Sequence, residues 1–270
     1  MITGSVVTFH TSKNDLQKVI DSFLGEELDR RLFVIDNSSD NRLSVICNDD
    51  RIHYIFNSKN IGFGAAHNVA FQLSYKLNVD YHITLNPDIS FNPEIIDLLI
   101  TKANSDQKIG MIMPKIIYPD GKTQYLCKLL PTPFDLILRR FFTFKKIKTI
   151  LNEKYELRFT SYEQIMEPPV LSGCFMFLRL KTLKQVSGFD TRYFMYLEDV
   201  DLCRKIGELS KLVYYPDCEV VHNYEKGSYS NLKLLKFHIK SAIKYFNKWG
   251  WIFDKKRKEI NTRTLKQLNF

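Results

Sequence analysis

The sequence lacks the features that mark secreted, zinc-binding and membrane-spanning proteins. Its five cysteines are odd in number and contain no C-x-x-C pair, which argues against a disulfide framework or a structural zinc site. The chain does not open on a basic segment followed by an apolar one, so we expect no signal peptide. No apolar run approaches the roughly 20 residues that cross a bilayer. These absences favour a cytoplasmic protein in a reducing compartment, which can still lie on a membrane surface.

Internal repeats and low-complexity linkers are also missing. With 270 residues, 44% of them hydrophobic, the chain is long enough for one large α/β domain, or for one domain with an added segment. The net charge of +9 predicts an anionic partner: nucleic acid, acidic lipid or a phosphorylated substrate. The cationic residues are dispersed or terminal and form no recognised nucleic-acid-binding module, so nucleic acid is disfavoured.

Short apolar runs alternate with segments of helical spacing over the first hundred residues. The runs that predict strands are 5–9, 31–35, 52–56 and 81–85. A helix is expected over 14–28, a second one ends near Leu77, and a third follows Pro93. This alternation predicts a Rossmann-type, mostly parallel central sheet flanked by helices. Ligands of such sheets bind beyond the carboxyl ends of the strands, where polar clusters occur here.

The later part of the chain is less regular. Further strands are expected at 109–113, 116–118, 170–178 and 212–215, and a basic helix from Asn231 forms a C-terminal extension. The segment 131–151 interleaves apolar residues with Arg139, Arg140, Lys145, Lys146 and Lys148. It is either a helix packed on the core or one that lies at a membrane interface. We expect a domain over residues 1–230 and the extension over 231–270.

Several polar residues follow predicted strands. Asp36 can accept hydrogen bonds from a nucleobase or a ribose, or can form a simple turn. Gly62 and Gly64 precede a helix, so the backbone there can approach a phosphate, although the loop lacks the third glycine of G-x-G-x-x-G. Asp88, the last residue of Asn86-Pro87-Asp88, can bind a hard divalent cation. Alternatively, these three residues form a simple turn. His222 is a metal ligand or a core histidine.

Three carboxylates lie within four residues, at Glu198, Asp199 and Asp201, between an aromatic run and apolar residues. Carboxylates in apolar surroundings have raised pKa values, which suits a general base near neutral pH. The alternative is the first turn of a helix, where acids accept hydrogen bonds from free N–H groups.

The order of these motifs is more specific than any one of them. The succession VIDNSSD, NIGFGAAHN, LNPD, LSGCFMFLR, GFDTRYFMYLEDVDLCRK and VVHNYEKGS resembles family-two glycosyltransferases of the GT-A fold. It is most similar to the bacterial rhamnosyltransferase branch, which builds O-antigen and related cell-surface polysaccharides. The resemblance covers about residues 3 to 230.

The resemblance implies roles for individual residues. Those expected to bind the nucleotide sugar are Thr8, His10, Asp36, Asn60, Gly64, Asn68, Asn86 and Arg204. Asp88 and His222 are expected to hold the metal, with Asn86 in place of the first acid of the family's D-x-D motif. Asp199 matches the catalytic base, while Glu198 and Asp201 orient base and acceptor. Arg204 pairs with an acid or with phosphate.

The resemblance also implies the reaction and its partners. It predicts an inverting transfer from a nucleotide-sugar donor to a glycan or lipid-linked saccharide, with Mg²⁺ or Mn²⁺. The favoured donor is dTDP-L-rhamnose, with UDP- or GDP-sugars as alternatives, and the favoured acceptor is GlcNAc-diphosphate-undecaprenol. The charge fits peripheral contact with the anionic inner face of the cell membrane. A nucleotidyltransferase is disfavoured because no glycine-rich loop opens the chain. A non-catalytic anion-binding protein and the oligomeric state stay open.

Overall fold

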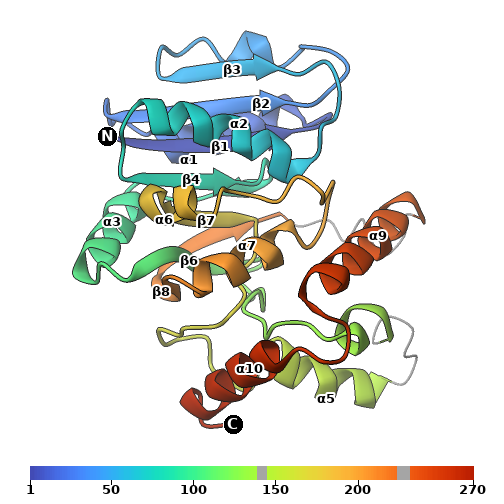
Figure 1. The fold of residues 1–270 in the computed structure, drawn as a ribbon. Coiled ribbons are helices and arrows are strands. Elements are labelled where there is room, and N and C mark those ends of the chain that lie inside the picture. Colours follow the sequence, from blue (N-terminus) through green and yellow to red (C-terminus); the bar gives the residue numbers. More distant parts are fainter. Residues whose placement is uncertain (139–144, 224–231) are drawn as a thin grey trace.

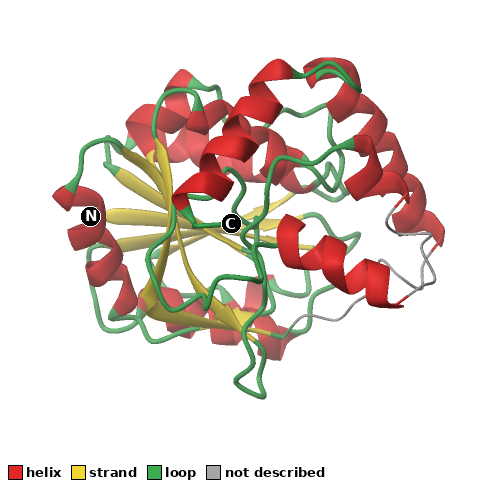
Figure 2. Cartoon of the chain, turned by 90° about the horizontal axis from the view of Figure 1, so that it is seen from below, coloured by secondary structure: helices red, strands yellow, loops and turns green. Residues whose placement is uncertain are grey.

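The structure is a computed structural model that describes residues 1–138, 145–223 and 232–270. Its centre is an eight-stranded sheet with the strand order β3-β2-β1-β4-β7-β6-β8-β5. The pairs β1–β2, β2–β3, β1–β4 and β6–β8 are parallel, whereas β7 is antiparallel to β4 and β6, and β5 is antiparallel to β8. Helices lie on both sides of the sheet (Figure 2). The predicted mostly parallel α/β sheet is therefore confirmed.

The first half of the chain follows the pattern predicted from the sequence. Its elements are β1 (Ile2–Thr8), α1 (Lys13–Leu24), β2 (Arg30–Asp36), η1 (Ser44–Ile46), β3 (Ile52–Phe56), α2 (Phe63–Lys76), β4 (Tyr81–Leu85), β5 (Ile89–Ser90) and α3 (Ile95–Ser105). Ser12 begins α1 by accepting a hydrogen bond from the backbone N–H of Asp15. In Figure 1, α2 lies in front of the sheet and α1 behind it. Both pack on β1 and β2 and bury the apolar faces of those strands.

The second half departs from the prediction in four places, the last of them in the C-terminal extension. Its elements are β6 (Ile109–Ile117), η2 (Phe134–Leu138), α5 (Lys145–Tyr155), β7 (Phe175–Arg179), α6 (Leu180–Gln185), α7 (Glu198–Gly207), β8 (Lys211–His222), α9 (Leu232–Trp249) and α10 (Lys255–Gln267). The runs at 109–113 and 116–118 form one strand, β6, that continues through Pro114. The expected strand 170–178 begins only at Phe175, because Gly173 turns its backbone toward α7.

The third departure is β8, which is a single strand of 12 residues rather than a short strand and a separate edge segment. A register shift against β6 between Pro114 and Lys115 absorbs the extra residues of β8, and pairing resumes from Glu219 to Val221. The alternation of apolar residues breaks at such an irregularity, so the sequence there resembles the end of a strand. The continuous strand carries His222 to the edge of the sheet beside β5.

The C-terminal extension contains two helices, α9 and α10, instead of the expected single helix. The chain turns between them at Gly250, which has a φ of +102° that other residues rarely adopt. Of the basic segment 131–151, Arg139 and Arg140 lie outside the described residues, as do the side chains of Lys145, Lys146 and Lys148. Within the described ranges, no helix combines the length and the apolar character that crossing a membrane requires.

Three hydrophobic clusters of the described residues hold these layers together, one of them between α2 and the strands β1 and β2. The main one fills the space between the sheet and its helices. A smaller one lies between α7 and α9 and includes Val200, Ala242, Tyr245 and Phe246. The extension therefore packs on the helix that carries the acidic motif (Figure 1).

Candidate active site

The first group of predicted site residues lies where β1 and β2 end. Thr8 and Asp36 are register partners on these two strands and both are fully buried. The carboxylate of Asp36 accepts hydrogen bonds from the Ser38 N–H at 2.9 Å and from the Tyr54 hydroxyl at 2.6 Å. Burial, and then the neighbouring Asp36, raise the pKa of Tyr54. His10 is exposed, with a φ of +55°, and its backbone N–H donates to Ser38. Nucleotide contacts by Thr8, His10 and Asp36 stay predictions.

Asn60 orders the loop that follows β3. Its side-chain oxygen accepts hydrogen bonds from the Gly62 N–H at 2.9 Å and from the Asn37 amide at 3.4 Å. Gly62 has a φ of +92°, and a Cβ on it would lie 2.5 Å from the carbonyl oxygen of Phe194. Only glycine fits here, because the segment preceding the acidic motif crosses directly over this loop.

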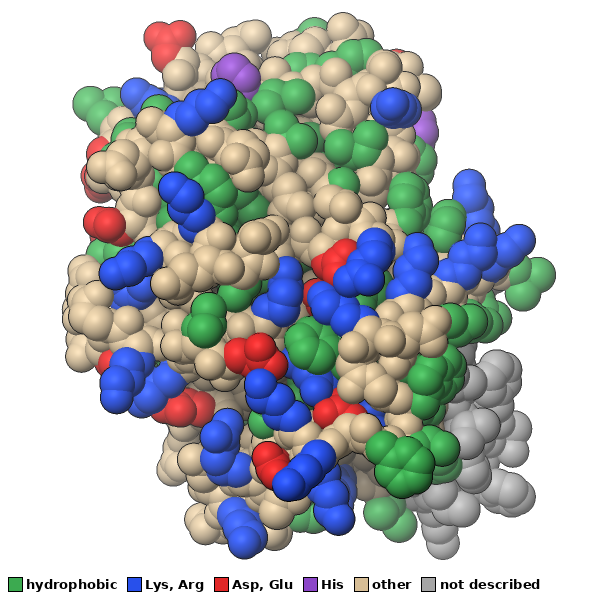
Figure 3. All heavy atoms as spheres, in the orientation of Figure 1, with side chains coloured by type: hydrophobic (Ala, Val, Ile, Leu, Met, Phe, Trp, Pro, Cys, Tyr) green, Lys and Arg blue, Asp and Glu red, His purple; other side chains and the backbone are tan. Residues whose placement is uncertain are grey.

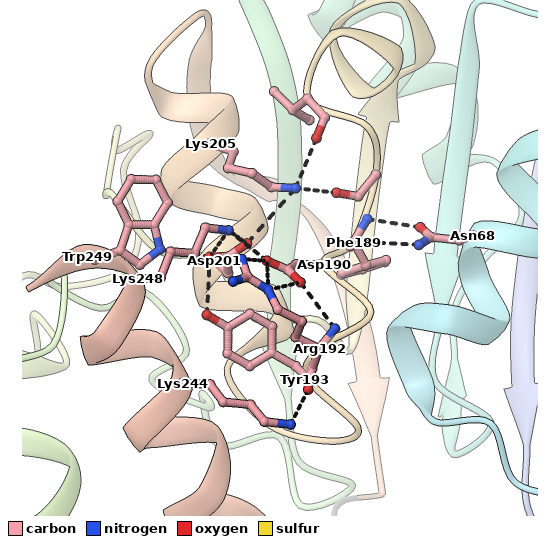
Figure 4. Close-up of polar contacts among 12 residues, drawn as sticks. Asn68, Phe189, Asp190, Arg192, Tyr193, Asp201, Lys205, Lys244, Lys248 and Trp249 are labelled. Carbon is pink, nitrogen blue, oxygen red and sulfur yellow. Dashed lines mark hydrogen bonds and ion pairs between the residues drawn. The ribbon is translucent and has the colours of Figure 1, made fainter.

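The segment before the acidic motif, which includes Phe189 and Phe194, also covers the first turns of α2. The Phe63 N–H donates to the Phe194 carbonyl at 3.1 Å, and a Cβ on Gly64 would lie 2.8 Å from that of Phe189. Asn68 bonds with both its amide atoms to the backbone of Phe189, at 2.8 and 2.9 Å (Figure 4). In this structure Gly64 and Asn68 therefore join α2 to the segment before α7. Their expected role in nucleotide binding stays a prediction.

The second group of predicted residues forms the expected metal pair. Nε2 of His222 lies 3.3 Å from Oδ1 of Asp88 and 3.5 Å from the amide nitrogen of Asn86. Asp88 precedes β5, and His222 is paired with Ile89 of that strand, so the sheet itself sets this distance. Gln124 orients the imidazole ring from the other side, because its side-chain oxygen lies 3.0 Å from Nδ1. Burial lowers the pKa of His222, but hydrogen bonds with Asp88 and Cys174 outweigh burial and raise it to about 10.

These residues fit a divalent cation. Oδ1 of Asp88 is buried and faces Nε2 of His222 at 3.3 Å, so once the imidazole loses its proton, this carboxylate oxygen and the ring nitrogen can both ligate a cation. An imidazole beside a carboxylate suits Mn²⁺, and the oxygen ligands alone suit Mg²⁺. The described residues contain no group of three or more His, Cys, Asp or Glu side chains arranged around one point. A cation held here would therefore take its remaining ligands from water or from the donor's phosphates.

A short segment connects Asp199 to Asp88 and His222 through hydrogen bonds. Its Oδ2 accepts a hydrogen bond from the Gly173 N–H at 3.1 Å, and its Oδ1 accepts one from the Val200 N–H at 2.8 Å. The carbonyl of Cys174 accepts a hydrogen bond from the Asn86 N–H at 2.9 Å. Residues 172–174 thus bridge the acid of α7 and the Asn86-Pro87-Asp88 turn. The carboxylate of Asp199 is only partly buried and is held by backbone N–H groups, without a cationic partner in the described structure.

Glu198 differs from its neighbour in burial. Tyr196 and Leu197 both have a positive φ, and this unusual backbone directs Glu198 into the protein. Its side chain is buried, and Oε2 has no hydrogen-bond partner in the described part of the chain. Burial, and then the charge of Asp199, raise the pKa of Glu198 to about 8. At neutral pH Glu198 is therefore mostly protonated.

Asp201 and Arg204 face the C-terminal helices. Asp201 is fully buried and accepts hydrogen bonds from Trp249 Nε1 at 2.7 Å and Lys248 Nζ at 2.8 Å (Figure 4). Arg204 forms two bonds with Asp254, at 2.6 and 2.8 Å, and its guanidinium lies 4.2 Å from the ring centre of Trp249. Of the two partners expected for Arg204, an acid or a phosphate, the structure shows the acid. The roles of Asp201 toward acceptor and base, and of Arg204 toward the donor, stay predictions. We call Asp201, Arg204, Lys248, Trp249 and Asp254 the C-terminal clamp.

Sequence patterns did not point to Gln124, Lys248 or Asp254. Each acts through a partner that is far away in the chain, so no local spacing marks it. Gly173, which interrupts an apolar run, and Trp249, which follows a basic helix, carried a signal that suggested a close contact but not its partner.

Comparison with known proteins assigns the family. The sequence profile of glycosyl transferase family 2 matches residues 5–185, which is more than half of the chain. The chain belongs to glycosyl transferase family 2. It is 33% identical to the N-acetylglucosaminyl-diphospho-decaprenol L-rhamnosyltransferase of Mycobacterium tuberculosis (strain ATCC 25618 / H37Rv) over 151 residues, which cover 53% of this chain and 47% of that protein. It is 25% identical to the rhamnosyltransferase WbbL of Escherichia coli (strain K12) over 251 residues, which cover 89% and 90% of the two chains.

Solved structures share the fold of this family 2 chain. The crystal structure of GalNAc-T7 with UDP, GalNAc and Mn²⁺ superposes with a TM-score of 0.61 at 16% identity, over 88% of this chain and 47% of that one. The mannosyltransferase PcManGT from Pyrobaculum calidifontis, in complex with GDP-Man and Mn²⁺, gives a TM-score of 0.57 at 12% identity, over 98% and 74%. The expected GT-A-like fold is confirmed, as is the similarity to rhamnosyltransferases.

The family profile ends before α7. Asp199, His222 and the C-terminal clamp therefore lie outside the matched residues. A cavity of about 850 Å³ lies between α5 and α10, away from the residues at the strand ends. A smaller one, of about 280 Å³, is bounded by Asp88.

Proposed function

We propose that this family 2 chain transfers a sugar, with inversion, from a nucleoside diphosphate donor to a hydroxyl group of an acceptor. One observation carries the proposal: residues 172–174 are bonded on one side to Asp199 and on the other to the Asn86-Pro87-Asp88 turn. A base and an anion-neutralising site held by one short segment match the two demands of such a transfer. One group must deprotonate the acceptor, and another must stabilise the departing diphosphate.

Asp199 is the proposed general base. Its carboxylate is partly exposed, and two backbone N–H groups fix its position. Burial raises the pKa of the neighbouring Glu198 carboxyl to about 8, so Glu198 adds little negative charge beside Asp199 at neutral pH. Asp199 takes the proton of the acceptor hydroxyl as that oxygen attacks the anomeric carbon from the face opposite the leaving group. One attack from one face inverts the configuration, and no covalent intermediate with the enzyme forms.

Asp88 and His222 are the proposed ligands of Mg²⁺ or Mn²⁺, with Gln124 holding the imidazole ring in place. When bound, the cation neutralises charge on the diphosphate leaving group. Asn86 carries no charge, so this turn contributes one carboxylate instead of two. The Mn²⁺ in the two structural neighbours supports a divalent cation in this fold.

The proposed donor is dTDP-L-rhamnose, and the proposed acceptor is GlcNAc linked through a diphosphate to a polyprenol such as undecaprenol. The support comes from the names of the relatives, which are rhamnosyltransferases, one of them for a decaprenol-linked acceptor. UDP- and GDP-sugars are the alternatives, because the structural neighbours were solved with UDP and GDP-Man. The product belongs to O-antigen or a related cell-surface polysaccharide.

The proposed location is the cytoplasm, at the inner face of the cell membrane. The net charge of +9 favours anionic lipid, and basic side chains gather over the lower half of the face shown in Figure 3. Sedimentation with anionic vesicles tests this contact; protein that stays in the supernatant at low salt rules it out. Residues 231–270 form the proposed extension of the domain 1–230, and the clamp fixes the extension to α7.

Turnover with purified protein tests the proposed function. The assay contains Mg²⁺ or Mn²⁺, GlcNAc-diphosphate-lipid and a panel of dTDP-, UDP- and GDP-sugars, and reads the product by mass. We expect addition of rhamnose from dTDP-L-rhamnose alone, lost in Asp199→Asn. Addition from another donor overturns the rhamnose assignment but keeps the transferase. No transfer and no nucleotide binding by a folded protein contradict the enzyme itself.

A further inference from the structure

A cavity of about 850 Å³ opens between α5, the loop before α10 and α10 itself, away from the strand-end residues. Its volume is within the range of sites that bind organic ligands. Much of its wall is apolar, and its hydrophobic residues include Leu129, Leu130, Ile150, Leu151, Leu265 and Phe270. Figure 1 shows α5 and α10 side by side at the end of the molecule that carries the C-terminus.

Three polar side chains of the wall, those of Asp135, Asp254 and Asn261, are already engaged within the protein. Asp135 accepts hydrogen bonds from the N–H and the hydroxyl of Thr132, at 2.8 and 2.6 Å. Asn261 bonds with both amide atoms to the backbone of Leu130, at 2.9 Å each, and Asp254 is paired with Arg204. Because these groups are satisfied, the cavity offers a ligand mainly apolar contact. A sugar or a nucleotide would leave its own hydroxyl groups unpaired there.

Large apolar side chains are exposed to solvent at the mouth of the cavity. Phe253 is 96% exposed and Ile252 is 77% exposed, and both line the cavity. Large apolar side chains exposed together mark a contact with another molecule or with a membrane. Lys154, Lys255 and Lys258 also line it, and Lys255 is 92% exposed. An apolar interior with a basic rim complements a long hydrocarbon chain that ends in phosphate.

Hydrogen bonds from Arg257 hold two walls of the cavity in place. Its buried guanidinium donates hydrogen bonds to the carbonyls of Pro131 at 3.3 Å and Trp251 at 3.0 Å. These bonds hold the loop with Ile252 and Phe253 against the segment that carries Leu129 and Leu130.

We propose that this cavity binds the polyprenyl chain of the lipid-linked acceptor, with the lysines of the rim facing its diphosphate. The inference rests on the proposed function, since it assigns a site to that acceptor. The wall is also connected to the chemistry: Asp254 pairs with Arg204, which follows Asp199 on α7 by five residues, or about 7.5 Å along the helix axis. One rigid helix therefore joins the chain-binding wall to the general base.

Photocrosslinking tests the site without requiring turnover. The probe is a polyprenyl diphosphate with a benzophenone near the end of its chain, mixed with the full-length protein in detergent and analysed by peptide mass mapping. We expect crosslinks within residues 129–135, 150–155 and 252–270, suppressed by unlabelled polyprenyl diphosphate. Crosslinks elsewhere, or equal suppression by a diacyl phospholipid, overturn the assignment.

Kinetics with two acceptors sharpens the test. Both carry the same sugar diphosphate, one on a long polyprenyl chain and one on a short water-soluble chain. Thr262→Trp and Ile150→Glu change exposed residues that line the cavity, and Leu98→Glu on α3 is the matched surface control. Each methylene buried contributes about fourfold in affinity, so we expect the cavity variants to lose at least about tenfold in kcat/KM for the long chain. Their kcat/KM for the short chain should be unchanged.

The outcomes separate the inference from the proposed function. An equal loss for both acceptors, or no loss for either, overturns the chain-binding site while the transferase stands. If the wild-type protein transfers sugar to neither acceptor, the proposed function fails, and the crosslinking result then decides whether the cavity binds a polyprenyl chain at all.

Discussion

The first turn of α7 carries two acids of the same motif in opposite situations. Asp199 is partly exposed and accepts hydrogen bonds only from backbone N–H groups. Two residues further, Asp201 is fully buried, and its carboxylate accepts hydrogen bonds from Lys248 and Trp249 of the C-terminal clamp. The carboxylate of Asp199 can still accept a proton, whereas that of Asp201 bonds α7 to the C-terminal helix α9.

With Asp199 as the proposed base, one short segment would serve chemistry and stability at once. A general base needs an accessible carboxylate with a fixed position, and backbone donors provide that without neutralising it. An anchor needs burial and charged partners, because a buried charge is stable only when it is paired. The clamp thereby keeps α7 in the place that Asp199 requires.

The largest expected effect is on turnover, from Asp199→Asn. The amide keeps the size of the side chain but does not accept the acceptor's proton, so we expect turnover to fall about 10²- to 10⁴-fold. Because the present bonds come from backbone donors to the carboxylate oxygens, the melting temperature should change little. Turnover and thermal unfolding on the same sample measure both. Turnover within a factor of two of wild type would assign the base elsewhere.

The complementary change in the same turn of α7 is Asp201→Asn. It removes the charge that pairs with Lys248, which we expect to lower the free energy of unfolding by about 3 kcal/mol. Urea unfolding provides the measurement, and Asp120→Asn, which breaks an exposed pair with Lys122, is the control expected to cost below about 1 kcal/mol. Equal losses of stability in the two variants would contradict the clamp.

The metal pair gives the third test. Gln124→Leu removes the side chain that orients His222 and should weaken Mn²⁺ binding about 10- to 100-fold, without removing a ligand. Calorimetric titration with Mn²⁺ measures the affinity. Gln185→Leu, at an exposed position of α6, is the matched control and should bind Mn²⁺ as wild type does. Unchanged affinity in Gln124→Leu would remove His222 from the metal site.

The last test is a pH dependence caused by Glu198. Its pKa in the folded protein is about 8, above the ordinary value of 4.5, so the folded state binds its proton more tightly than the unfolded state. Stability from this group is present below pH 4.5 and is lost as the pH rises toward about 8, with a slope of at most about 1.4 kcal/mol per pH unit. Glu198→Gln should lack this slope. Urea unfolding across that pH window compares the two proteins; parallel curves would show that Glu198 is charged throughout.

Much of the fold was predictable because its signals are local. β3 and β4 have the bounds expected from their apolar runs, and the residues after β2 and β4 are at the predicted edge of the sheet. The errors occurred where a distant partner decides the structure. The start of β7 depends on the bond between Gly173 and Asp199, and the length of β8 depends on its irregular pairing with β6.

The sequence by itself determined that strands alternate with helices, that polar residues follow the strands, and that three acids are clustered before an apolar helix face. It did not distinguish these acids, since Glu198, Asp199 and Asp201 share chemistry and near-identical neighbours. Only the tertiary structure gives the three acids different environments. Successive residues of a helix point in directions about 100° apart, so packing of α7 against α2, residues 172–174 and α9 gives each acid a different environment. Burial and the available donors then decide which acid is neutral, which remains available as a base and which is paired.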